Sequence, residues 1–138
     1  MKSGTDYSDI NPAEELRYKH LWRSIAYLII LAIVFLSLMP DPQKVTPFSA
    51  SDKLMHTLAY GVSMIWFGLC FKRDKLFPIA AGLVFMGIAL EVLQGLTGYR
   101  TMSLYDIFAN CAGVVIGFLF SLSPFSKSLY FIEQKLLR

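Results

Sequence analysis

Several residues able to do acid–base or anion-binding chemistry lie inside the long apolar runs of this 138-residue chain. Asp52, His56 and Tyr60 are spaced by four residues, so on a helix they form one stripe. Glu91 and Gln94 are three residues apart in a later apolar run and also share a helix face. Ionisable residues inside a bilayer are costly unless they are paired or solvated, so we expect these to serve a function.

A third group of polar residues lies at the start of the last apolar run: Arg100, Ser103, Asp106 and Asn110. The last three fall on one face of a helix. Ser103 and Asp106 also match the Ser-x-x-Asp pattern of an N-terminal capping box, in which each side chain bonds the backbone N–H of the other residue. Lys53, beside the first group, is a second positive charge near the same helix ends.

The residue types favour binding of an anionic group. Lys53 and Arg100 can hold a phosphate or another anion through charge-assisted hydrogen bonds. Glu91 and Asp106 can accept hydrogen bonds from hydroxyls or an amine. We therefore predict a substrate-binding site made of Asp52, Lys53, His56, Tyr60, Glu91, Gln94, Arg100, Ser103, Asp106 and Asn110.

Catalysis at the same site is the alternative. His56 can act as a general base oriented by Asp52 or Glu91, which makes His56, Glu91 and Asp106 the catalytic candidates. The serine of the group, Ser103, fits a helix cap better than a nucleophile. A metal site of His56, Glu91 and Asp106 resembles structural zinc poorly, because zinc favours cysteine and several histidines. We therefore predict no metal and no cofactor.

Four apolar runs must position these residues: 22–39, 54–71, 77–97 and 104–122. Each has about 18 to 21 residues, enough to cross a hydrocarbon core of roughly 30 Å. With 55% hydrophobic and 17% charged residues, the chain is too apolar for a soluble bundle of this size. We predict an all-α fold, a polytopic membrane bundle of four transmembrane helices.

A single domain, 1–138, accounts for the chain. We expect 1–21 to form a cytoplasmic helical extension, because Asn11 followed by a proline is a helix-start signature, and this helix should continue into the first span without a break. The membrane core is 22–122. Apolar and basic residues alternate in 123–138, which predicts a cytoplasmic tail with a short helix on the membrane surface.

Lysine and arginine residues predict the orientation, because they concentrate in cytoplasmic segments. The two terminal segments and the loop between the second and third runs carry ten of them: Lys2, Arg17, Lys19, Arg23, Lys72, Arg73, Lys75, Lys127, Lys135 and Arg138. The other two loops carry three: Lys44, Lys53 and Arg100. Both termini are therefore predicted to be cytoplasmic.

This orientation places the polar residues at one depth. His56, Glu91 and Asn110 lie about 6, 9 and 10 Å from the outward ends of their helices. Three helices therefore bring polar groups to one level in the outer third of the membrane. A purely structural knot of these residues is the competing interpretation, and we expect Gly113 and Gly117 to allow close helix packing in either case.

At these residues the chain resembles the VanZ-like family of small membrane proteins. The resemblance spans roughly 28–122 and implies a multi-spanning bacterial membrane protein. The best-known member lowers sensitivity to teicoplanin, a drug that binds cell-wall precursors; this chain is shorter than that member. Three motifs match in order: Asp52-Lys53-Leu54-Met55-His56 with Tyr60 and Gly61, then Glu91-Val92-Leu93-Gln94, then Arg100-x-x-Ser103-x-x-Asp106 running on to Asn110 and Gly113.

Together these features predict a multi-pass protein of the inner (cytoplasmic) membrane. Its outward-facing site is expected to bind an envelope lipid or a lipid-linked cell-wall precursor, with a link to glycopeptide antibiotic sensitivity. The alternatives are a membrane hydrolase or transferase that uses His56 with Glu91 or Asp106, and a structural or partner-binding membrane subunit. The net charge of +3 is scattered in short clusters and gives no reason to expect a nucleic-acid partner.

Overall fold

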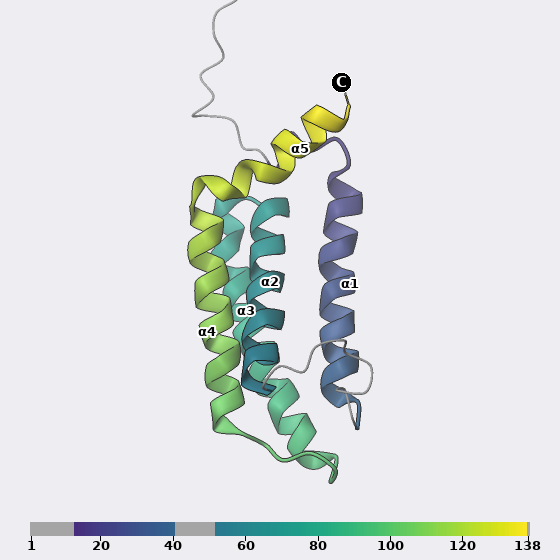
Figure 1. Ribbon diagram of the computed structural model, residues 1–138, viewed down its shortest axis with the longest axis vertical. Coiled ribbons are helices and arrows are strands. Elements are labelled where there is room, and N and C mark those ends of the chain that lie inside the picture. The colour runs from purple at the N-terminus through teal and green to yellow at the C-terminus, as the bar shows by residue number, and fades with distance from the viewer. Residues whose placement is uncertain (1–12, 41–51, 138) are drawn as a thin grey trace, which may run out of the picture.

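The computed structural model describes residues 13–40 and 52–137, and this part of the chain is helical and contains no strand (Figure 1). Four long helices run up and down beside one another, and a short one lies across one end of the bundle. The elements are α1 (Lys19–Leu38), α2 (Asp52–Cys70), α3 (Arg73–Leu96), α4 (Leu104–Leu122), the 3-10 turn η2 (Pro124–Lys127) and α5 (Ser128–Leu136).

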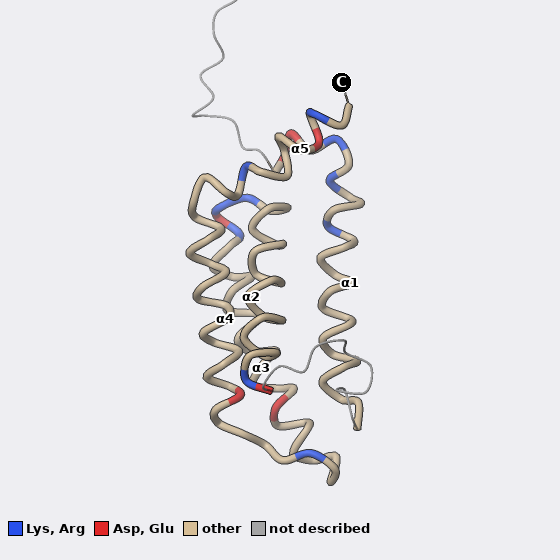
Figure 2. The backbone as a smooth tube through the Cα atoms, viewed as in Figure 1, with Lys and Arg blue, Asp and Glu red and all other residues tan. Residues whose placement is uncertain are grey.

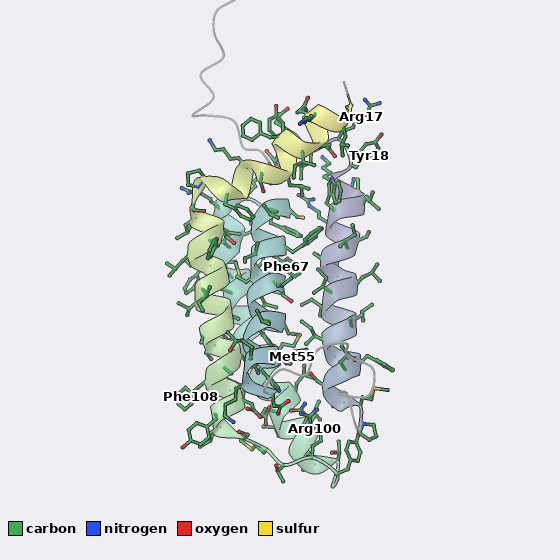
Figure 3. The ribbon with its side chains drawn as sticks, viewed as in Figure 1. Arg17, Tyr18, Met55, Phe67, Arg100 and Phe108 are labelled. Atoms are coloured by element: carbon green, nitrogen blue, oxygen red, sulfur yellow. The ribbon has the colours of Figure 1, made fainter. Side chains whose placement is uncertain are left out.

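Helix α2 lies at the centre of the bundle and contacts α1, α3 and α4. The core between these helices is apolar and is formed by Ile33, Tyr60, Met64, Leu76, Leu83, Leu90 and Val114. The outer faces are also apolar: Phe85 of α3 and Phe108 of α4 are 74% and 69% exposed, and Phe108 points away from the bundle in Figure 3. An apolar exterior of this extent is typical of a surface that faces lipid.

Three helices are long and apolar enough to cross a membrane: α1, α3 and α4. At about 1.5 Å per residue their lengths correspond to roughly 28 to 36 Å. These helices confirm the predicted all-helical membrane protein at this level of detail. Helix α2 is more polar because Lys53, His56 and Tyr60 fall in its first half, so its membrane crossing stays a prediction.

Backbone contact between α2 and α4 sets their close approach. A Cβ atom at Gly113 would lie 2.3 Å from the Thr57 carbonyl oxygen, and one at Gly117 would lie 2.6 Å from the Gly61 carbonyl oxygen. The hydroxyl of Thr57 donates a hydrogen bond to the Ala109 carbonyl across the same contact, at 3.2 Å. The glycines therefore have the packing role expected for them in membrane helices.

The N-terminal segment differs from the predicted continuous helix. Asn11 lies outside the described residues, 13–18 form turns, and α1 begins only at Lys19. The reason is a long-range contact: the Glu133 carboxylate of α5 accepts hydrogen bonds from the backbone N–H groups of Arg17 and Tyr18, at 2.7 and 3.0 Å. The N–H of Tyr18, the N-cap residue, is one of the groups that a helix start leaves without partners, so α5 caps α1.

The tail does form the predicted short helix, α5, which lies across the bundle end, with Arg17 and Tyr18 beside it in Figure 3. Glu133 is buried there and also accepts a hydrogen bond from the Trp22 indole N–H, at 3.0 Å. Burial raises the pKa of Glu133, but the hydrogen bonds from Trp22, Arg17 and Tyr18 outweigh it and hold the pKa below its usual value.

Candidate functional site

The predicted polar residues gather at the end of the bundle opposite α5. Figure 2 shows acidic residues of α2, α3 and α4 at this end, and Figure 3 places Arg100 beside them. They come from the start of α2, the last turns of α3, the α3–α4 connection and the first turns of α4. Because antiparallel neighbours place these termini at one end, residues distant in sequence meet there.

His56 is held by a hydrogen bond from α4. Its Nδ1 lies 2.9 Å from Oδ1 of Asn110, which is buried. An amide oxygen only accepts hydrogen bonds, so this contact assigns the proton of a neutral imidazole to Nδ1. The other ring nitrogen, Nε2, then carries a lone pair that can take a proton or bind a cation.

Asp52 lies between two positive or potentially positive groups. Its carboxylate oxygens are 3.9 Å from Nε2 of His56 and 3.7 Å from a guanidinium nitrogen of Arg100. Both separations exceed the roughly 2.7–2.9 Å of a charge-assisted hydrogen bond. The Asp52 side chain is 47% exposed, so these loose pairs leave its carboxylate able to move.

Glu91 contacts the start of α4. Its side chain is 1% exposed, and Oε1 accepts a hydrogen bond from the backbone N–H of Ser103 at 2.6 Å. In a capping box Asp106 would take this N–H, and the Ser103 side chain would accept one in return. Within the described residues Ser103 makes no such side-chain bond. The predicted Ser103–Asp106 capping box is therefore wrong, because Glu91 from the neighbouring helix occupies the same donor.

Two carboxylate oxygens of the cluster are buried without a hydrogen-bond partner among the described residues: Oε2 of Glu91 and Oδ1 of Asp106. Asp106 itself is only 7% exposed. A buried polar atom with no partner is destabilising and calls for an explanation. The part of the chain that the structure describes supplies no partner, so these two oxygens are the atoms of the cluster that a ligand could satisfy.

Three predicted site residues have other surroundings. Gln94 is buried and donates from its amide to the Ser37 carbonyl at 2.7 Å, which fastens α3 to the end of α1. Tyr60 is part of the apolar core. Lys53 is exposed and lies over the ring of Tyr105, with its ammonium 5.8 Å from the ring centre.

Thr57 and Glu133 were not identified from the sequence. The backbone carbonyl of Thr57 faces Gly113 of α4 and its hydroxyl bonds the Ala109 carbonyl, and the only sequence signal was its place directly after His56. Glu133 carried a weaker signal, a single acid among the apolar and basic residues of the tail.

A cavity of about 510 Å³ lies at the α5 end of the bundle, away from the polar cluster, and is lined by Arg23, Phe71, Lys72, Lys75, Pro78 and Ile79.

Comparison of the chain with models of protein families, with curated proteins and with solved structures finds no match. The VanZ-like resemblance therefore stays a prediction that depends on its three motifs. Function has to be argued from the polar cluster itself.

Proposed function

We propose that this chain is a VanZ-like bacterial inner-membrane protein of four transmembrane helices whose outward-facing polar cluster binds the head group of an envelope lipid or a lipid-linked cell-wall precursor. One observation carries the proposal. Three helices bring ionisable side chains together at one end of an otherwise lipid-facing bundle, and two buried carboxylate oxygens there lack partners within residues 13–40 and 52–137. Buried polar groups of this kind in a membrane protein usually mark a functional site.

The central position of α2 supports its role as the fourth span. Its seven buried residues include Tyr60 and Ser63, whose polar groups are shielded by neighbouring helices; the charged Asp52 and Lys53 are exposed at its first turn. A helix that faces protein rather than lipid tolerates a lower hydropathy. The ten-to-three distribution of lysine and arginine supports an outward-facing cluster and cytoplasmic termini.

Head-group binding fits the donors and acceptors present. Arg100 is partly buried, and its guanidinium is held only loosely by Asp52, so it is available to a phosphate oxygen. Glu91 and Asp106 offer acceptors for hydroxyls or an amine. A protein that binds a cell-wall precursor also competes with the glycopeptide antibiotics that bind such precursors, which gives the proposed link to antibiotic sensitivity a mechanism.

One observation favours a second candidate, a hydrolase or transferase acting on the same lipids. Asn110 fixes the His56 ring and leaves Nε2 as the basic nitrogen, with the Asp52 carboxylate 3.9 Å away. A general base needs this kind of orientation. Turnover of the bound lipid separates this enzyme from a binding protein.

The first experiment is native mass spectrometry of the protein purified in mild detergent. We expect one phosphorylated or glycosylated lipid to stay with the wild type and to be lost from Glu91→Gln and His56→Ala. Glu15→Gln and His20→Ala are the matched controls, because both residues are exposed and distant from the cluster. Bulk phospholipid retained equally by all five proteins contradicts the proposal. A joint loss of thermal stability in the two site variants, without a specific lipid, favours the structural or partner-binding subunit.

A further inference from the structure

We infer a divalent-cation site in the polar cluster, formed by Asp52, His56 and Asp106. Each residue offers one ligand atom, and the three atoms lie within 4.8 Å of one another. The site shares its location with the proposed head-group site, but it can be tested without any lipid.

The charges of the cluster call for a cation. Among the described residues the cluster has three carboxylates: Asp52, Glu91 and Asp106. Its two cations are Arg100, which pairs with Asp52, and Lys53, whose ammonium lies over the Tyr105 ring. Oδ1 of Asp106, one of the three ligand residues, is buried without a hydrogen-bond partner among the described residues. A carboxylate this deeply buried is costly when unpaired, and a divalent ion would compensate it.

The orientation of His56 is an independent argument. Histidines that bind metals usually donate their other ring N–H to a protein acceptor, which fixes the tautomer and raises the basicity of the ligating nitrogen. Asn110 supplies that acceptor, since its Oδ1 is 2.9 Å from Nδ1. Nε2 is then the ligand atom, and it lies on the Asp52 side of the ring.

The three ligand atoms must move slightly closer together to bind one ion. Ligand atoms about 2.1 Å from a tetrahedral ion are roughly 3.4 Å apart, so a group spanning up to 4.8 Å must close by about 1.4 Å at most. Asp52 can make this movement, because it is the exposed member and its contacts to His56 and Arg100 are long.

The ligand set indicates the kind of ion. One imidazole nitrogen with two carboxylate oxygens is unlike a structural zinc site. It agrees with catalytic sites in having three protein ligands, a number that leaves a position for water or substrate. Imidazole suits Zn²⁺ and carboxylates suit Mn²⁺, so these are the two probes. The open position would bind a head-group oxygen, and this last role alone rests on the proposed function.

The test uses untagged full-length protein, stripped with a chelator and titrated with Zn²⁺ or Mn²⁺ in detergent. Metal content after dialysis should reach one ion per chain. We expect Asp106→Asn and His56→Gln to weaken binding about tenfold or more. Asp74→Asn and His20→Gln, which change exposed residues at the other end, should bind as the wild type does. If the buried Asp106→Asn variant does not fold, Asp52→Asn tests the same site at an exposed ligand.

Two results would overturn the cation site: no stoichiometric binding by the wild type, or equal binding by the ligand variants and the controls. The result of this test can be distinguished from the result of the test of the proposed function. One ion per chain with no specific lipid contradicts the head-group proposal and leaves the cation site intact. If chelator-stripped protein retains a specific lipid but binds no added ion, the cation site is contradicted and the head-group proposal stays intact.

Discussion

Gly113→Ala is the most direct test of how α2 and α4 hold the polar cluster together. The new Cβ would lie 2.3 Å from the Thr57 carbonyl oxygen and 3.0 Å from the Gly61 nitrogen, both backbone atoms. Carbon–oxygen contacts normally lie at about 3.3 Å or more, so the helices must separate by roughly 1 Å. That shift would break the 3.2 Å hydrogen bond from Thr57 to Ala109.

The expected loss of stability is about 2 to 4 kcal/mol. Overpacking of this kind costs about 1–3 kcal/mol, and the lost hydrogen bond adds about 1 kcal/mol. Thermal or denaturant unfolding in detergent measures it, and Gly82→Ala is the matched control. Position 82 has nothing within 4 Å of its Cβ, so alanine there should be neutral or stabilising by up to about 1 kcal/mol.

The same separation would stretch the contact between His56 and Asn110, which spans α2 and α4 and is now 2.9 Å long. Gly113→Ala should therefore also weaken binding at the cluster, whereas Gly82→Ala should not. If Gly113→Ala unfolds at the same temperature as the wild type, the two helices are not in backbone contact, and the geometry of the cluster derived from that contact is wrong.

Three further predictions concern other parts of the chain. Glu133→Ala should lower stability by about 2–4 kcal/mol, since two backbone N–H groups and an indole lose their acceptor. Folding lowers the pKa of Glu133, so its contribution to the free energy of unfolding is complete above the unfolded-state pKa of about 4.3 and is lost as the pH falls through the lower folded-state pKa. Acid titration of the stability of wild type and variant will measure this loss. Gln94→Ala should cost about 1–2 kcal/mol by releasing α1, whereas Gln134→Ala, at an exposed position, should cost less than about 0.5 kcal/mol in the same unfolding assay. Single cysteines at Thr101 and Asp74 should react with impermeant reagents from the outer and the cytoplasmic side respectively, and the reverse pattern refutes the orientation.

The polar cluster could be predicted from the sequence because its signals are local. The four-residue spacing of Asp52 and His56 fixes one helix face, and short loops between antiparallel helices bring Glu91 and Asn110 to the same end. The hydrogen bond between His56 and Asn110 is consistent with that reasoning. Helix spacing and loop length were sufficient for this part of the site.

Residues with competing partners could not be assigned in this way. The Ser103–Asp106 pattern is a valid local cap, but Glu91, twelve residues earlier, takes the same N–H. Gln94 shares a helix face with Glu91 yet reaches a carbonyl at the end of α1. The sequence does not show which backbone carbonyl of another helix is free to accept a hydrogen bond. A local pattern therefore cannot predict which side chain will bond to it.

The cap that α5 provides for α1 links the order of synthesis to the order of assembly. Arg17 leaves the ribosome 116 residues before Glu133, which supplies its hydrogen-bond acceptor. At about 5 to 20 residues per second this interval is roughly 6 to 23 s. During that time the backbone N–H groups of Arg17 and Tyr18 lack the Glu133 carboxylate as their acceptor. The docking of α5 on the start of α1 is therefore a late event, and a ribosome stalled before Glu133 should expose Arg17 and Tyr18 to protease.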